Sequence, residues 1–281
     1  MKLVDNIQRM SMLSKILKKE GKSIGFVPTM GYLHDGHMSL ARAARQHTDV
    51  VVISIFVNPA QFGPGEDLEK YPKDLKRDEE MAGLAGADVL FCPSVSEMYP
   101  EGYATYVNVE RLTETLCGRS RPAHFKGVAT VVAKLFGIIK PDIAYFGQKD
   151  AQQAAVIKKM AEDLNMDVEI KVLPITREKD GLAMSSRNVY LSAAERKDAV
   201  CLKEALDKAE RAVKDGERDP GVIINGMKEL ISSKPSARID YIEMVDSKNL
   251  RPIAPLSGDV LIAMAVFIGN TRLIDNVIVK I

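Results

Sequence analysis

Two histidines three residues apart, His34 and His37, are the side chains whose spacing most clearly indicates chemistry. They stand in a turn that follows a short apolar strand and leads into a stretch rich in helix formers, from Met38 to Ala44. The first N–H groups of a helix have no partner within the helix, and the helix dipole favours negative charge there. Two imidazoles beside such N–H groups therefore predict an anion site, with phosphate as the expected ligand.

A metal site or a purely structural role is the alternative for these histidines. The chain has 4 histidines in all, and no cysteine or carboxylate joins the pair at the spacing of a metal site. We therefore predict phosphate binding and no metal ion held by protein ligands.

Other polar side chains follow buried strands. Lys149 comes directly after a predicted strand, and Gln153 lies one helical turn further along, on the same face of the next helix. The loop from Asn58 to Gly65, which contains Gln61, follows another predicted strand. Ligands of parallel α/β sheets bind at the carboxyl ends of strands, so we expect these side chains and the histidine turn to meet at one site.

The elements that must position these side chains alternate between strands and helices, which predicts a parallel sheet wound as in nucleotide-binding folds. The predicted strands are residues 24–27, 50–57, 88–91, 104–109, 143–146 and 168–174. The predicted helices are residues 4–19, a helix that follows the histidine turn and includes residues 38–44, and residues 73–84, 124–140 and 151–164. Pro28 has no N–H group and is expected to end the first strand.

A change of composition predicts two domains, residues 1–176 and residues 177–281. In the second, Ser192 and Glu195 form a capping box that opens a charged helix expected to reach residue 214, and another helix follows Pro220. Strands are predicted at residues 239–244, 260–268 and 273–281, the last two joined as a hairpin at Gly269-Asn270. The α+β tail from Ser192 onward has no evident catalytic cluster and is expected to act as a lid or dimer partner.

Composition excludes several functional classes. A formal net charge of +1 gives no electrostatic case for nucleic acid or an acidic membrane surface. The 3 cysteines are scattered, which favours a reducing compartment over a disulfide framework. The N-terminus lacks the apolar region of a signal peptide, and the longest apolar run, residues 260–267, is too short to span a bilayer. We expect a cytoplasmic protein.

Six blocks of the chain together resemble one enzyme family. The blocks are P-T-M-G-Y-L-H-D-G-H, S-I-F-V-N-P-A-Q-F, Y-P, R-P-A-H-F-K-G-V, F-G-Q-K-D-A-Q-Q and L-A-M-S-S-R-N. The first resembles the H-x-G-H signature of the nucleotidyltransferase superfamily. All six, in this order between residues 25 and 192, resemble the pantothenate synthetase (pantoate–β-alanine ligase) family.

The resemblance implies an α/β fold, a Rossmann-like doubly wound parallel sheet with a smaller C-terminal α+β domain. It also implies a ligase that uses ATP and Mg²⁺ to join pantoate to β-alanine through a pantoyl adenylate, giving pantothenate, AMP and pyrophosphate. Mg²⁺ is expected to be held mainly by phosphate oxygens and water; Asp78 and Asp150 are at most outer contacts. A homodimer is expected from the family alone.

The resemblance also assigns residues. Catalytic roles fall on His34, His37, Lys149, Ser185, Ser186 and Arg187. ATP binding falls on Met30, Gly31, Tyr32, Leu33, His34, Asp35, Gly36, His37, Gly147, Gln148, Lys149, Asp150, Thr176, Met184, Ser185, Ser186 and Arg187. Substrate binding falls on Gln61, Gln153 and Asn58. Arg121 and His124 have either a substrate role or a structural one.

Three other functions share part of this pattern. An adenylyl- or cytidylyltransferase would share H-x-G-H but would not explain F-G-Q-K-D-A-Q-Q. A fragment of an aminoacyl-tRNA synthetase would need a tRNA-binding extension and usually a basic surface. A non-catalytic nucleotide sensor would bind ATP without turnover, and His34, His37, Lys149 and Arg187 argue against it.

Overall fold

The computed structural model describes residues 1–281 and consists of two compact units. Unit 1 comprises residues Met1–Glu110, Arg121–Gln148 and Val156–Pro174. Unit 2 comprises residues Arg111–Ser120, Lys149–Ala155 and Ile175–Ile281. The chain thus enters unit 2 twice for a few residues before it crosses finally between Pro174 and Ile175.

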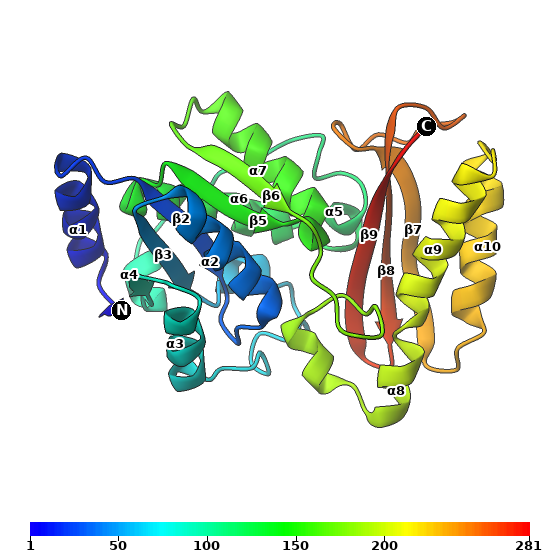
Figure 1. Ribbon diagram of the computed structural model, residues 1–281, viewed down its shortest axis with the longest axis horizontal. Helices are drawn as coiled ribbons and strands as arrows, with labels where there is room; N and C mark the ends of the chain where they lie inside the picture. The colour runs from blue at the N-terminus through cyan, green and yellow to red at the C-terminus, as the bar shows by residue number, and fades with distance from the viewer. The chain divides into compact units, whose positions relative to one another are not determined.

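Unit 1 is built on a six-stranded sheet in the order β1-β4-β3-β2-β5-β6, and every strand pair is parallel (Figure 1). Its elements are β1 (Lys2–Val4), α1 (Ile7–Lys19), β2 (Ile24–Thr29), α2 (Asp35–His47), β3 (Val50–Ile55), η1 (Pro59–Gln61), α3 (Leu75–Leu84), β4 (Val89–Phe91), α4 (Val95–Met98), α6 (His124–Ile139), β5 (Ile143–Gly147) and β6 (Glu169–Leu173). The short helix η2 (Gln148–Asp150) and α7 (Ala151–Asp163) carry residues of both units. The predicted Rossmann-like fold is confirmed.

Alternation along the central strands explains why helices cover both faces of this sheet. Phe26 and Val27 are neighbours on β2 and therefore point to opposite faces. Phe26 packs edge-on against Phe136 of α6, whereas Val27 joins the core formed with α2 and α3. Both residues are fully buried, as expected for strands that read as continuous apolar runs.

Three sequence predictions in unit 1 were wrong. Pro28 does not end β2, which continues to Thr29; pairing with β5 covers only Gly25 and Phe26, so Pro28 lies where β2 is paired on one side only. Residues 104–109 form no strand. The N-terminal helix begins later than predicted, because Asn6 caps it and the preceding residues form the short strand β1.

Unit 2 is built on a three-stranded antiparallel sheet in the order β7-β8-β9. Its elements are α5 (Cys117–Ser120), η3 (Ser186–Tyr190), α8 (Ala193–Asp198), α9 (Cys201–Lys214), α10 (Pro220–Ser232), β7 (Ala237–Asp246), β8 (Asp259–Ile268) and β9 (Thr271–Lys280). Helices α9 and α10 pack on the sheet through one apolar core (Figure 1). The predicted hairpin is confirmed, since Ile268 pairs with Thr271 across Gly269-Asn270.

The capping box at the start of the charged helix is also confirmed. The Ser192 N–H donates to Glu195 Oε2 at 2.8 Å, and the Glu195 N–H donates to Ser192 Oγ at 3.3 Å. The single long helix predicted here is instead two, α8 and α9, separated at Ala199 and Val200. Both separating residues keep right-handed helical angles, and bonds of the i to i+3 type tighten the chain there.

Candidate functional site

The turn between β2 and α2 has a left-handed backbone conformation that is unfavourable for most residues other than glycine. Gly31 has φ of +84° and Tyr32 has φ of +49°, both in the left-handed region. A Cβ at Gly31 would come within 2.9 Å of Ile55 Cγ2, so glycine is needed for space as well as for conformation.

Asp78 of α3 holds this turn in place. Its carboxylate accepts hydrogen bonds from the backbone N–H groups of Tyr32 at 2.8 Å and Leu33 at 2.6 Å. Asp78 is 1% exposed, and this burial raises the pKa of its carboxyl, while the two N–H groups act in the opposite direction. The structure therefore gives Asp78 a role as anchor of the histidine turn.

The two histidines form a capping box at the start of α2, which begins at Asp35, so the turn and the first helical residues carry them as predicted. His34 is the N-cap, and its Nδ1 accepts the Gly36 N–H at 3.1 Å. The Nδ1 of His37 accepts the His34 N–H at 3.3 Å. Because both Nδ1 atoms act as acceptors, each neutral ring carries its proton on Nε2. The helix start thus orients two imidazoles, with ring centres 4.0 Å apart, as Nε2–H donors.

Gln61 is held by a network of polar contacts within unit 1. Its Oε1 accepts a hydrogen bond from Asn58 Nδ2 at 3.0 Å, and its Nε2 donates to Met30 Sδ at 3.2 Å. Met30 begins the histidine turn, so the predicted substrate loop and the predicted nucleotide turn are in contact. A thioether is a weak acceptor, and the Gln61 NH₂ group therefore keeps donor capacity for a stronger acceptor such as a substrate oxygen.

Arg121 and His124 hold the backbone of the same residue. The carbonyl oxygen of Gln61 accepts from Arg121 Nη2 at 3.2 Å and lies 2.9 Å from His124 Nδ1. Arg121 is itself paired with Glu66, at 2.7 Å and 2.5 Å. Burial alone would raise the pKa of the Glu66 carboxyl, but the hydrogen bonds and charge of Arg121 lower it overall. These contacts favour the structural role for Arg121 and His124.

Helix α6 approaches the predicted substrate loop, at Ala60 and Gln61, so closely that one position must be glycine. A Cβ at Gly127 would come within 2.6 Å of Gln61 N and closer still to the Ala60 carbonyl. The carbonyl of Gly127 accepts from Asn58 Nδ2 at 3.1 Å. The short helix η1 is therefore seated directly on the first turn of α6.

Unit 2 holds the second group of predicted residues. Lys149 Nζ lies 3.9 Å from Asp150 Oδ2, and the Lys149 carbonyl accepts from Asn276 Nδ2 of β9 at 3.0 Å. Gln153 is half-buried on α7. Its neighbour Gln152 is buried and forms hydrogen bonds with three backbone groups at and before α5. These bonds give the Gln152 side chain a structural role.

The segment from residue 176 to residue 188 brings five further predicted residues together. The Met184 N–H donates to the Thr176 carbonyl at 3.0 Å, which folds the segment back on itself. Ser185 caps η3, its Oγ accepting the Arg187 N–H at 3.2 Å. Ser186 is buried, and Arg187 is half-buried on the first turn of η3.

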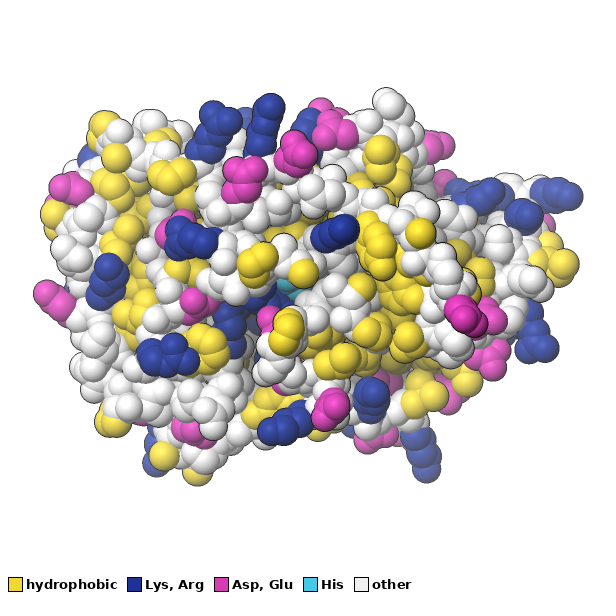
Figure 2. Space-filling view, turned by 180° about the vertical axis from the view of Figure 1, so that it is seen from behind, with side chains coloured by type: hydrophobic (Ala, Val, Ile, Leu, Met, Phe, Trp, Pro, Cys, Tyr) yellow, Lys and Arg dark blue, Asp and Glu magenta, His cyan; other side chains and the backbone are white.

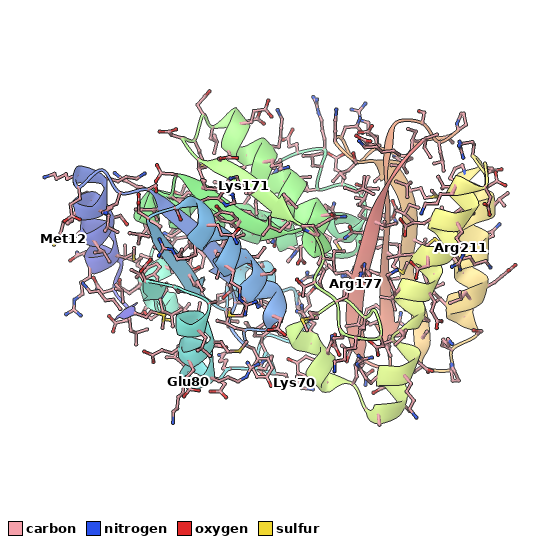
Figure 3. All side chains as sticks on the ribbon, in the orientation of Figure 1. Met12, Lys70, Glu80, Lys171, Arg177 and Arg211 are labelled. Carbon is pink, nitrogen blue, oxygen red and sulfur yellow. The ribbon has the colours of Figure 1, made fainter.

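A paired arginine fastens this segment to the sheet of unit 2. Arg177, labelled in Figure 3, donates two hydrogen bonds to Asp275 of β9, at 2.7 Å and 3.0 Å. The Asp275 side chain is 1% exposed, so Arg177 forms a bidentate ion pair with a buried carboxylate. Arg177 also donates to the Gly181 carbonyl at 3.0 Å.

Sequence reasoning did not single out Tyr99 or Gly127, and it considered Asp78 only as an outer contact of Mg²⁺. Gly127 stands inside a block quoted for the family resemblance, and a glycine on an apolar helix is a signal of close approach. Tyr99 donates to Asn58 Oδ1 at 2.8 Å, a contact across 41 residues that no local pattern reveals.

Surface charge, metal ligands and helix hydrophobicity each bear on a sequence prediction. Figure 2 shows basic and acidic side chains interspersed over the face that it presents. No group of three or more His, Cys, Asp and Glu side chains is placed to hold a metal ion. None of the helices is both long enough and apolar enough to span a bilayer.

Comparison with known proteins gives consistent matches over the whole chain. Residues 2–278 match the family described as Pantoate-beta-alanine ligase. The pantothenate synthetase of Caldicellulosiruptor bescii is 57% identical over 280 residues, which cover 100% of this chain and 99% of the relative. That of Heliobacterium modesticaldum is 57% identical over 281 residues, covering 100% of both chains.

Solved structures give the same result. The pantothenate synthetase of Thermus thermophilus superimposes with a TM-score of 0.93 and 44% identity, covering 99% of each chain. The pantoate-beta-alanine ligase of Francisella tularensis, solved with Beta-gamma ATP and beta-alanine, has a TM-score of 0.82 and 35% identity, covering 99% of this chain and 97% of its own.

Proposed function

This chain belongs to the pantoate–β-alanine ligase family, and we propose that it joins pantoate to β-alanine in two ATP-dependent steps. In the first, a carboxylate oxygen of pantoate attacks the α-phosphorus of ATP, the bond to the β-phosphate breaks, and pyrophosphate leaves. In the second, the amine of β-alanine attacks the acyl carbon of the pantoyl adenylate, the acyl C–O bond breaks, and AMP leaves. The amine loses its proton to solvent.

The observation that carries this proposal is the histidine capping box. The rings of His34 and His37 accept at Nδ1 within the cap and so carry Nε2–H donors beside the N-terminal N–H groups of α2. A phosphoryl transfer needs such fixed donors, because charge builds on the phosphate oxygens as the carboxylate attacks. A carboxylate nucleophile brings no proton to remove, so the histidines act as donors and not as general bases.

Lys149 and Arg187 are the cations that the proposal requires. Lys149 and Arg187 carry positive charge for the phosphates, and the planar guanidinium of Arg187 suits the departing pyrophosphate. Ser185 and Ser186 shape the turn that carries Arg187. The remaining predicted ATP contacts are backbone groups and side chains of the same segments.

Gln61 and Gln153 are proposed to bind pantoate. Carboxamides suit its hydroxyl and carboxylate groups without adding charge to a site that already holds a triphosphate. The Gln61 NH₂ group donates to a thioether, that of Met30, and so keeps donor capacity for a substrate oxygen. β-Alanine is expected beside the same residue.

Mg²⁺ fits the proposal as part of the ATP substrate. The side chains present offer no cage of carboxylates for it, and this ion usually keeps water and phosphate ligands. When bound, it would neutralise phosphate charge during the transfer.

The experiment that tests the proposal measures pyrophosphate release from MgATP and pantoate, with and without β-alanine. Pyrophosphate that depends on pantoate, with AMP and pantothenate appearing only when β-alanine is added, is the expected result. Pyrophosphate release with other acceptors but not with pantoate would instead identify a nucleotidyltransferase. ATP binding without turnover under any pairing would identify a nucleotide sensor.

A substitution at His37 separates the helix cap from the chemistry. His37→Gln keeps an acceptor at the third helical position, where glutamine serves in capping boxes, but removes the imidazole donor. We expect the rate of pyrophosphate release to fall by roughly 10² or more, the scale of one transition-state donor, with little change in melting temperature.

The matched control is His47→Ala, because His47 is exposed in the last turn of the same helix. It should leave the rate unchanged. A His37→Gln protein that turns over within a few-fold of the unaltered chain would remove His37 from the mechanism.

Three further properties are proposed. A homodimeric state rests on the family resemblance alone, whereas a cytoplasmic location rests on composition and the N-terminal sequence. A catalytic domain of residues 1–176, followed by a lid or dimer-associated domain of residues 177–281, rests on the sequence pattern. Light scattering coupled to gel filtration tests the first: a mass near twice the 30.9 kDa of one chain is expected.

A further inference from the structure

Every hydrogen-bonding position of the Asn58 carboxamide is used inside the protein. Its Nδ2 donates to Gln61 Oε1 at 3.0 Å and to the Gly127 carbonyl at 3.1 Å. Its Oδ1 accepts from the Ala60 N–H at 3.3 Å and from the Tyr99 hydroxyl at 2.8 Å. An asparagine side chain has two donor hydrogens and two strong acceptor positions, so nothing is left over for a substrate. Asn58 therefore acts on its neighbours.

The orientation of this carboxamide is determined by partners that have only one role. The Gly127 carbonyl can only accept, and the Ala60 N–H can only donate. Turning the Asn58 carboxamide over would set two donors against each other at Ala60 and two acceptors against each other at Gly127. Asn58 is 1% exposed, so water cannot relieve either conflict.

The orientation of Asn58 in turn decides that of Gln61. Because Asn58 presents an NH₂ group to it, Gln61 must present its Oε1 in return. The Nε2 end of Gln61 is then turned the other way, toward Met30 at the start of the histidine turn. Asn58, which has no position left for the ligand, therefore determines that Gln61 offers the ligand a donor and not an acceptor.

Tyr99 makes the shorter of the two bonds to Asn58 Oδ1. Since that oxygen can only accept, the phenol must donate. Burial raises the pKa of the Tyr99 phenol, so the hydroxyl keeps its proton. The ring is held edge-on by Tyr103, with ring centres 5.0 Å apart, and packs against Phe56 at 6.2 Å. The Lys134 ammonium lies over both tyrosine rings.

We propose that Tyr99 is a positioning residue for pantoate: acting through Asn58, it holds the Gln61 carboxamide with its NH₂ group available to the substrate. The inference rests on the proposed function, because pantoate is the ligand assigned there to Gln61. It adds a residue to which the resemblance and the sequence pattern gave no role.

The test is a double-mutant cycle between Tyr99→Phe and Gln61→Ala, with steady-state constants measured separately for pantoate and ATP. Tyr99→Phe removes one neutral hydrogen bond and should raise KM for pantoate roughly 2- to 10-fold. The values of kcat and of KM for ATP should stay within about twofold, because the lost contact affects binding of one substrate. In the Gln61→Ala background, Tyr99→Phe should have no further effect on pantoate.

Tyr103→Phe is the matched control, since it removes a hydroxyl from the adjacent ring and keeps the ring packing. It should change none of these constants. Equal effects of the two substitutions, additive effects in the cycle, or parallel changes in KM for both substrates would overturn the proposal.

A second readout does not depend on turnover. The side-chain NH₂ resonances of Asn58 and Gln61 are recorded by NMR without substrate. Both should shift in Tyr99→Phe, and neither should shift in Tyr103→Phe. Unshifted Gln61 resonances would overturn the positioning role. If the unaltered chain released no pantoate-dependent pyrophosphate, the proposed function would fall, and the resonances would still decide whether Tyr99 positions Gln61.

Discussion

Replacing Gly127 with alanine should displace the predicted substrate loop, although alanine by itself would stabilise helix α6. An alanine within a helix is ordinarily more stable than a glycine by about 1 kcal/mol. Here the added Cβ would lie within 2.6 Å of Gln61 N. An ordinary contact between such atoms is about 3.5 Å, so the loop must move by about 1 Å.

That displacement has two expected consequences. Overpacking of this kind typically costs about 1–3 kcal/mol, and the bond from Asn58 to the Gly127 carbonyl, at 3.1 Å, would stretch beyond hydrogen-bond length. After the helix gain is subtracted, we expect a net loss of up to about 2 kcal/mol in the free energy of unfolding. Displacement of a substrate-positioning group by about 1 Å can lower a rate by up to roughly 10², so kcat/KM for pantoate should fall at least tenfold.

Gly137 provides the matched control, because it lies in the same helix and a Cβ there would meet nothing within 4 Å. Gly137→Ala should be stabilising by about 0.5–1 kcal/mol, with unchanged kinetics. Urea unfolding gives the first quantity and the coupled pyrophosphate assay the second. A Gly127→Ala protein that matched Gly137→Ala in stability, with an unaltered kcat/KM for pantoate, would refute the reasoning.

Two further predictions concern ion pairs. Arg177→Met should lower the free energy of unfolding by about 3–5 kcal/mol, because it leaves the buried Asp275 carboxylate without its cationic partner. Urea unfolding measures this loss. The double variant Arg177→Met/Asp275→Leu should recover most of it. Glu66→Gln should remove a pH-dependent stabilisation. Burial would raise the pKa of the Glu66 carboxyl, but the hydrogen bonds and charge of Arg121 hold it below its ordinary value. The pair therefore stabilises the fold above the ordinary carboxyl pKa and ceases to do so as the pH falls through the lowered pKa. The difference in melting temperature between the two proteins should therefore be constant from about pH 6 to 8 and shrink in acid; a difference that grew in acid would contradict the assignment.

Local pattern alone was enough for much of unit 1. Apolar runs of β-branched residues predicted the central strands, and helical periodicity predicted α6 within one residue of its observed end. The strand, glycine-bearing turn and helix around His34 and His37 were also predicted. These features depend on neighbours along the chain, which a sequence displays directly.

Other predictions were wrong because the decisive contact lies elsewhere in the fold. Pro28 is compatible with β2 only because β5 does not pair at that level. Residues 104–109 carry a β-like composition, yet the Val107 N–H is satisfied by Thr130 Oγ1 of α6 and not by a strand. The short strand β1 exists because β4 pairs with it.

The sequence by itself determined the chemistry of this protein: which side chains donate, which carry charge, and which turn presents them. Only the tertiary structure decided how they are aimed. The orientation of Gln61 depends on Asn58, Gly127 and Tyr99, and its backbone on Arg121, partners up to 69 residues away along the chain from one another. Hydrogen bonds of this kind are directional and short, so they exist only once packing has brought both atoms within about 3 Å, and no local pattern records that event.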